Sequence, residues 1–161
     1  MFSRPFSLLD RPLTGLLRLF QVIVRRAGVA DAAMLAELRD VGRDRLEAYA
    51  AWVAAHAQTH LPFVAEIDGY VVGAAWLFVA ERPPSKESAE RWYGDVQSVM
   101  VREEHRNRGI GSALMAAILT EARDRDLVHV TVHSGRRAVA FYLRAGFRHD
   151  GQLLLWEPAA R

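Results

Sequence analysis

The sequence predicts an α+β domain built around a largely antiparallel sheet, and three observations lead to this expectation. Two β-rich runs, residues 61–67 and 70–79, are joined by Asp68-Gly69, a dipeptide typical of a tight hairpin. A third run, residues 95–101, is followed by a glycine-bearing loop and then by an alanine- and leucine-rich helix over 112–124. An apolar content of 51% in 161 residues is enough for one sizeable core, which indicates a single domain.

The remaining elements follow from the same periodicities. Asp31 is placed to cap a helix, and Gly146 is placed to end one. The other strands are expected at 21–25, 127–132 and 153–156, and the other helices at 31–38, 43–56 and 136–145.

Composition narrows the classes of function. The 21 basic and 19 acidic residues leave a formal charge of +2, a weak long-range attraction for nucleic acid. Cysteine is absent, which excludes a disulfide framework and a cysteine nucleophile and makes the cytoplasm the expected compartment. Apolar stretches within residues 1–20 are interrupted by Asp10, Arg11 and Pro12, well short of a membrane-spanning length. We expect no membrane segment, an irregular or short helical arm over 1–20, and one domain over 21–158.

The loop after the 95–101 strand carries the strongest chemical signal. Gly109 and Gly111 stand where a helix begins, which lets the backbone turn tightly and directs amide groups at an anion. Arg106 and Arg108 flank this turn and can add charge-assisted hydrogen bonds to a phosphate. A Rossmann motif needs a third glycine where Leu114 stands, and the Gly-Lys-Ser/Thr of a P-loop is missing. By itself the loop fits either a phosphate-binding turn or an ordinary helix-opening turn.

Two blocks of the sequence resemble the GNAT acetyltransferase family. Residues 99–114, which contain the glycine loop, are similar to that family's acetyl-CoA motif. Residues 138–147, in which Phe141-Tyr142 precede Gly146-Phe147, are similar to its later signature, and the likeness extends over about 21–156. The resemblance implies a GNAT fold with six or seven strands, splayed between the fourth and the fifth, and about four helices. It also implies acetyl-CoA or another acyl-CoA as co-substrate, with no metal.

The resemblance further implies where the co-substrate binds. The matching positions lie on the fourth strand, the glycine loop and the start of the next helix: Val99, Met100, Val101, Arg106, Asn107, Arg108, Gly109, Ile110, Gly111 and Ser112. Gly135 stands where family members often have an asparagine. Ser134 beside it is either a substitute contact to the co-substrate or a helix N-cap.

Two residues are candidates for proton transfer. Tyr142 matches the family's tyrosine near the thioester sulfur, which implies that it protonates the departing thiolate; the alternative is a core aromatic. Asp95 is the candidate general base, because even spacing along a strand puts it on the same face as Val99. A base acting through water is the alternative. We expect the amine to attack the thioester directly and a backbone N–H near Val99 to meet the oxyanion.

The histidines offer little. His56 and His60 have helical i, i+4 spacing, but Ala57 replaces the glutamate of a His-Glu-x-x-His zinc site. A metal is therefore not expected. His105, beside the loop, is a minor candidate for a phosphate contact, and His129 and His133 are read as strand residues.

The acceptor is less defined than the donor. We expect it to enter around Tyr49, Trp52 and Trp92-Tyr93, with Trp76 in the core. The leading hypothesis is an N-acyltransferase acting on a small-molecule amine or on a peptide or protein N-terminus. A non-catalytic acyl-CoA-binding sensor would need neither Tyr142 nor Asp95. An RNA-binding module ranks last because the basic residues are scattered. A homodimer is left open.

Overall fold

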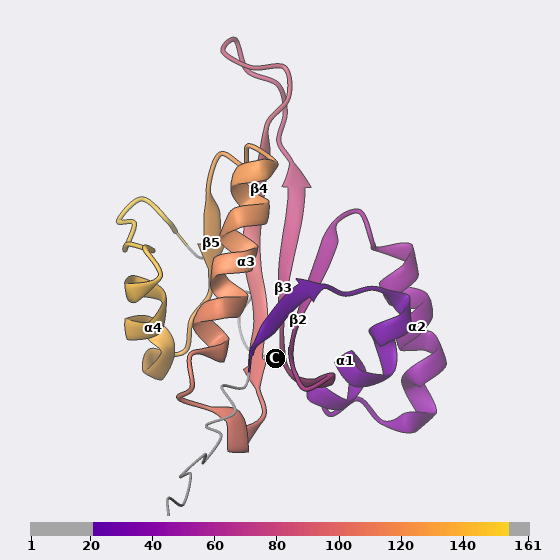
Figure 1. The fold of residues 1–161 in the computed structure, drawn as a ribbon. Coiled ribbons are helices and arrows are strands. Elements are labelled where there is room, and N and C mark those ends of the chain that lie inside the picture. The colour runs from indigo at the N-terminus through magenta and orange to yellow at the C-terminus, as the bar shows by residue number, and fades with distance from the viewer. Residues whose placement is uncertain (1–20, 155–161) are drawn as a thin grey trace, which may run out of the picture.

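The computed structural model describes residues 21–154 as a five-stranded sheet with helices on both of its faces (Figure 1). The strands, in chain order, are β1 (Ile23–Arg26), β2 (His60–Ile67), β3 (Tyr70–Glu81), β4 (Trp92–Val101) and β5 (Val130–Val132). They lie in the sheet in the same order. The pairs from β1 to β4 are antiparallel, whereas β4 and β5 are parallel. The predicted α+β class is confirmed.

The expected helices are also present. They are α1 (Ala32–Leu38), α2 (Leu46–Ala55), α3 (Ile110–Asp124) and α4 (Val139–Arg144). Four 3₁₀ turns accompany them: η1 (Val29–Asp31), η2 (Arg43–Arg45), η3 (Glu103–His105) and η4 (Arg136–Ala138). The expectation of six or seven strands differs from the five found within residues 21–154. Leu153 and Leu154 belong to no strand, the rest of the expected 153–156 strand lies outside the described residues, and so does the expected arm over 1–20.

The sheet is buried on both faces, and alternation along its strands decides which residues go to which side. One cluster packs the strands against α3: Leu61, Leu77, Val96, Ile110, Leu114 and Ile118 are among its buried members. The other packs β2 and β3 against α1 and α2, and contains Leu35, Val53, Val64, Val71, Ala74 and Trp76. Successive strand residues point to opposite faces, which is why Trp76 and Leu77 enter different clusters.

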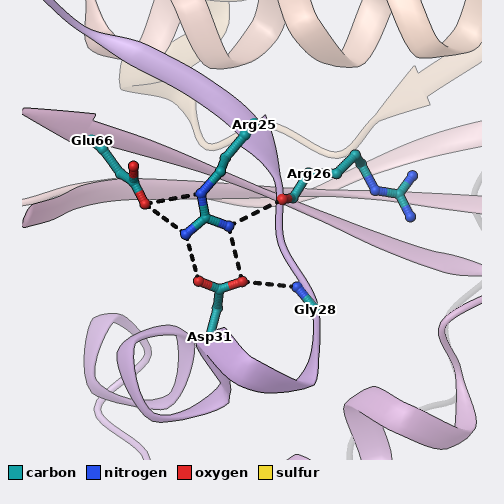
Figure 2. A network of polar contacts seen from close by, with 5 residues as sticks. All are labelled: Arg25, Arg26, Gly28, Asp31 and Glu66. Atoms are coloured by element: carbon teal, nitrogen blue, oxygen red, sulfur yellow. Dashed lines mark hydrogen bonds and ion pairs between the residues drawn. The ribbon is translucent and has the colours of Figure 1, made fainter. Parts of the chain in front are cut away.

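An ion-pair network holds the start of α1 to the edge of the sheet (Figure 2). The Arg25 guanidinium donates to both carboxylate oxygens of Asp31, at 3.0 and 2.7 Å, and to Glu66 Oε1 on β2, at 3.0 and 2.6 Å. Asp31 Oδ2 also accepts the Gly28 N–H at 3.0 Å. Asp31 thus precedes α1 as expected, but the prediction that its side chain caps α1 is wrong, because the carboxylate is already bound to Arg25 and Gly28.

The sheet opens between β4 and β5. Their parallel pairing covers only three positions, Gly94 to Val96 on β4, although β4 continues to Val101. The implied separation of the fourth and fifth strands is therefore present. Within residues 21–154, it leaves one edge of the last five residues of β4 without a neighbouring strand. Figure 1 shows α4 beyond β5, on the far side from α1 and α2.

Candidate functional site

A β-bulge lies at the point where β4 leaves β5. Gln97 pairs with Trp76 and Met100 with Ala74, so that Ser98 and Val99 together face the single residue Ala75. Ser98 has the left-handed φ of 55° that this extra residue requires. A bulge removes backbone groups from the ladder, which leaves N–H and C=O groups at this position available to a ligand.

The bulge overturns one sequence argument. Asp95 pairs with Phe78 on the face toward α1 and α2, whereas Val99 packs against the α3 cluster. The two side chains therefore lie on opposite faces, contrary to the even-spacing expectation. The extra residue at Ser98 shifts the alternation by one position. The backbone N–H of Val99 remains a candidate for charge stabilisation, because it does not depend on the side-chain face.

A cavity of about 510 Å³, here called the β4 hollow, lies beside the end of β4. Four predicted co-substrate residues line it: Val99, Met100, Val101 and Arg106. The rest of its wall comes from the end of α1 and from η3, and consists of Glu37, Leu38, Asp40, Arg102, Glu103 and Glu104. Because the wall holds four carboxylates and only two arginines, Arg102 and Arg106, its net charge is negative and a phosphate is disfavoured within the hollow, whereas a neutral chain with amide groups is suited to it.

The glycine loop leads from the hollow to the start of α3. Asn107 and Gly109 both have left-handed φ values, 60° and 81°, and a Cβ built at Gly109 meets nothing within 4 Å. The conformation of Gly109, rather than crowding, explains the glycine there. The Arg106 Nε donates to the Val101 carbonyl at 3.2 Å, which ties the loop to the end of β4. Asn107 and Arg108 are exposed.

The first turn of α3 offers unpaired N–H groups. The first helical hydrogen bond runs from the Ala113 N–H to the Gly109 carbonyl at 2.9 Å, so the N–H groups of Ile110, Gly111 and Ser112 have no partner within the helix. Ile110 is 1% exposed and its side chain belongs to the core, which leaves only its backbone for binding. A Cβ on Gly111 would lie 3.4 Å from the Phe141 ring, so glycine also allows α4 to approach.

Tyr142 and Asp95 are electrostatically coupled across the opened sheet. Burial, and secondarily the negative charge of Asp95, raise the pKa of the Tyr142 phenol above its ordinary value. The phenol is therefore protonated at neutral pH and able to donate. Asp95 is held by two neutral donors: Thr131 Oγ1 at 2.8 Å and Gln97 Nε2 at 3.3 Å. The Tyr142 ring also contacts Phe141 edge-on, with centroids 4.9 Å apart, so it is packed as well as polar.

A second, smaller cavity of about 210 Å³ lies on the α1 and α2 face of the sheet. We call it the aromatic pocket, and its wall consists of Arg39, Tyr49, Trp52, His60, Trp76, Gln97 and Ser98. Tyr49 and Trp52 were expected there. Trp76 is 4% exposed, as a core residue should be, and it also forms part of the wall. Trp92 and Tyr93 do not line the pocket; they begin β4, where Tyr93 packs on His129.

Several candidates are not brought to these cavities. The Ser134 hydroxyl donates to the Gly135 carbonyl at 3.0 Å, and no side-chain hydrogen bond caps η4, so the N-cap role suggested for Ser134 is wrong. His133 and His129 are exposed. The His105 Nδ1 is closed to water and has no partner among the described residues. Within residues 21–154, no group of three or more histidines or carboxylates gathers as a metal ion would require.

Sequence reasoning missed Arg39, Gln97 and Ser98. Arg39 follows α1, far from β4 in the chain, but its Nη1 donates to Ser98 Oγ. The available signal was Gln97-Ser98, two polar residues in the middle of an apolar strand. Such an interruption is typical of a bulge or a site at a strand edge.

Comparison with known proteins identifies the family. The model of the acetyltransferase (GNAT) family matches residues 27–147, most of the described chain. The chain belongs to the GNAT family. Its GNAT fold is also seen in a predicted acetyltransferase from Clostridium acetobutylicum, solved with acetyl-CoA, with a TM-score of 0.70, 15% identity and coverage of 85% of this chain and 96% of that one.

The curated relatives match this chain over only part of their own length. N-acetyltransferase family 8 member 2 of Rattus norvegicus is 29% identical over 119 residues, which cover 72% of this chain and 46% of that protein. Glucosamine 6-phosphate N-acetyltransferase of Trypanosoma brucei brucei is 30% identical over 88 residues, with 54% and 58% covered. The chain thus spans about half the length of these relatives. No helix within residues 21–154 has the length and apolarity needed to cross a bilayer.

Proposed function

We propose that this GNAT chain is an acetyl-CoA-dependent N-acetyltransferase that acts on a small-molecule amine. One observation carries the proposal: the β4 hollow reaches Val99 and the aromatic pocket reaches Ser98, so two separate cavities meet at consecutive residues of the bulge. A donor held in one and an amine held in the other would meet where β4 has backbone groups outside the ladder.

The loop and the hollow fit the two chemical parts of coenzyme A. The N–H groups of Gly111 and Ser112, with the exposed Arg108, suit its phosphates, because a helix N-terminus favours negative charge. Val99, Met100 and Val101 suit the neutral pantetheine arm, which can hydrogen-bond to the open edge of β4. Bound acetyl-CoA supplies an activated thioester.

The chain's own residues then act on that thioester. As the amine nitrogen bonds to the acyl carbon and the carbon–sulfur bond breaks, the Val99 N–H stabilises negative charge on the acyl oxygen. Asp95, directly or through water, accepts the proton that the nitrogen loses. Tyr142 donates a proton to the thiolate, and its raised pKa keeps that proton available. We also propose that the enzyme acts in the cytoplasm and that residues 21–158 form one domain.

A thiol-release assay tests the proposal. The protein is incubated with acetyl-CoA or longer acyl-CoAs and a panel of amines and short peptides, and the free thiol and acylated product are measured together. We expect one thiol for each acylated amine, with small amines ahead of peptides. Calorimetric binding of acetyl-CoA without thiol release from any amine would contradict an enzyme and support an acyl-CoA sensor. A preference for peptides would contradict the small-molecule acceptor.

A further inference from the structure

The aromatic pocket is polar at one end and apolar along its walls. Ser98 and Arg39 lie at the end next to the bulge, where Arg39 Nη1 donates to Ser98 Oγ. His60 lies at the other end: it pairs with Phe78 on β3, two residues beyond the Trp76 that faces Gln97. The side walls between these ends are rings. A ligand in this pocket therefore has one charged end and an apolar body.

The charge at the polar end is positive. Of the described residues that line the pocket, Arg39 is the only Arg, Lys, Asp or Glu. Among the described residues, no carboxylate lies within ion-pair distance of Arg39, whereas Arg25, Arg26 and Arg102 all have one. An uncompensated guanidinium at the mouth of an apolar pocket attracts a carboxylate and disfavours a second cation such as a polyamine or a lysine side chain.

The position of Arg39 decides how close the carboxylate and the amine must be. The amine has to reach the bulge, where the β4 hollow begins at Val99. Arg39 is bound to Ser98, the residue before it. An acceptor that uses both sites carries its carboxylate and its amine at the same end, as an α-amino acid does. The guanidinium also disfavours the ammonium form of a nearby amine, which favours the neutral nucleophile.

The walls select the rest of the ligand. Trp52 stacks on His56 with ring centroids 4.4 Å apart and meets Trp76 edge-on at 6.0 Å, which makes a wide aromatic surface. Burial and the neighbouring His56 lower the pKa of His60, so the far end is neutral at pH 7. At about 210 Å³ the pocket is smaller than a usual drug-sized site and has room for one large side chain.

Two polar atoms of the walls have no partner. The Tyr49 hydroxyl and the Trp76 indole N–H are closed to water and make no hydrogen bond within the described structure. Both can donate, and a buried donor left unpaired is unfavourable. A ligand with a hydrogen-bond acceptor that reached either donor would remove this cost.

We propose that the acceptor is a free α-amino acid with a large apolar or aromatic side chain. This inference rests on the proposed N-acetyltransferase function. Arg39 binds the carboxylate, the side chain lies against the surface made by Trp52 and Trp76, and the α-nitrogen faces the bulge. The acetyl group moves from sulfur to the α-nitrogen; the nitrogen loses one proton to the base, and the thiolate takes one from Tyr142.

Four acceptors that share a benzyl group test this proposal in the thiol-release assay. L-Phenylalanine has the carboxylate, phenylalaninamide and phenethylamine lack it, and phenylalanyl-alanine places it one residue further away. We expect kcat/KM for phenylalanine to exceed that for each of the other three by about tenfold or more, as for other sites built around a charged hydrogen-bonding group. Glycine, which lacks a side chain, should also be a poor acceptor.

Variants connect the preference to Arg39. Arg39→Gln should reduce the ratio of phenylalanine to phenethylamine turnover to about one, mainly through KM for phenylalanine. Arg45→Gln is the matched control, because Arg45 is strongly exposed and lines neither cavity. Trp52→Ala should lower the preference for phenylalanine over glycine. Thermal unfolding of each variant checks that it is folded.

The possible results distinguish a failure of the α-amino acid assignment from a failure of the proposed N-acetyltransferase function. Turnover of amines with no preference for phenylalanine, or a preference that survives in Arg39→Gln, overturns the α-amino acid assignment and leaves the N-acetyltransferase intact. A preference for phenylalanyl-alanine replaces it with a peptide N-terminus. No turnover of any amine overturns both, and calorimetry of phenylalanine against the CoA-bound protein should then also show no binding.

Discussion

The two cavities that meet at the bulge are built in different ways. The β4 hollow and the glycine loop draw most of their proposed donor contacts from one stretch of chain, residues 99–112, and use backbone groups. The aromatic pocket draws side chains from α2, β2, β3 and β4, and from Arg39, which follows α1. Backbone recognition along one stretch suits a donor common to a whole family. Side chains collected from several distant segments suit an acceptor that differs between members.

The largest expected effect is on the donor side alone. Gly109→Asp should weaken acetyl-CoA binding by about a hundredfold, since a carboxylate at the start of α3 would face the phosphates and a left-handed φ of 81° strains a side chain. Isothermal calorimetry measures it. Gly109→Asn is the matched control: it has the same shape and tolerance of this φ but no charge, so its loss should be much smaller. Equal losses in both would show that charge is not what the loop recognises.

The second-largest effect should be on the rate of the chemical step, with binding in both cavities unchanged. Tyr142→Phe should lower kcat by about a hundredfold while leaving acetyl-CoA affinity and acceptor KM near their original values. Because burial raises the pKa of Tyr142, ionisation of its phenol should not limit kcat below pH 10. Rate measurements across pH check both points. An unchanged kcat would indicate that Tyr142 serves only to pack against Phe141.

A smaller effect is expected from a change at the start of α1, which should alter both stability and acceptor binding. Asp31→Asn weakens the bidentate contact with Arg25, and we expect the free energy of unfolding to fall by about 1–2 kcal/mol at pH 7. Since Arg39 follows α1, acceptor KM should rise while acetyl-CoA affinity holds. Asp44→Asn is the control: its carboxylate is 81% exposed, and its loss should stay within about 0.5 kcal/mol.

The Asp31 effect should depend on pH in one direction. The hydrogen bonds from Arg25 hold the pKa of Asp31 below its ordinary value of 3.8, so the carboxylate stabilises the fold above that pH. The stabilisation is lost as the pH falls from 3.8 through the lower pKa of the folded state. Chemical denaturation of both proteins at several pH values should show their difference shrinking below pH 4. A difference that is constant with pH would contradict an ionic origin.

The smallest expected effect is at Ser134. Its hydroxyl contacts only the neighbouring Gly135 carbonyl, so Ser134→Ala should change acetyl-CoA affinity by less than about twofold. A larger loss of acetyl-CoA affinity, measured by calorimetry, would support Ser134 as a co-substrate contact and extend the proposed donor site toward α4.

Local sequence was sufficient for most of the fold. Asp68-Gly69 set the β2–β3 hairpin, and Gly69 has the positive φ, 81°, that such a turn needs. Apolar periodicity predicted the four α-helices found within residues 21–154, because a helix or strand face is determined by residues a few positions apart. The turn at Gly109 was also predictable, since the backbone conformation that opens a helix is a property of consecutive residues; its binding of phosphate stays a prediction.

Only the tertiary structure decided the rest. The bulge at Ser98 put Val99 and Asp95 on opposite faces, and no periodicity within β4 reveals an extra residue that is defined by pairing with Ala75. Likewise Arg39 and Ser98 are 59 positions apart in the chain, and their contact forms only once α1 packs on the sheet. The sequence by itself determined the family and the fold class, and it predicted the glycine loop as the donor site, because each depends on local pattern. The aromatic pocket depends on which distant side chains the packed sheet and helices bring together.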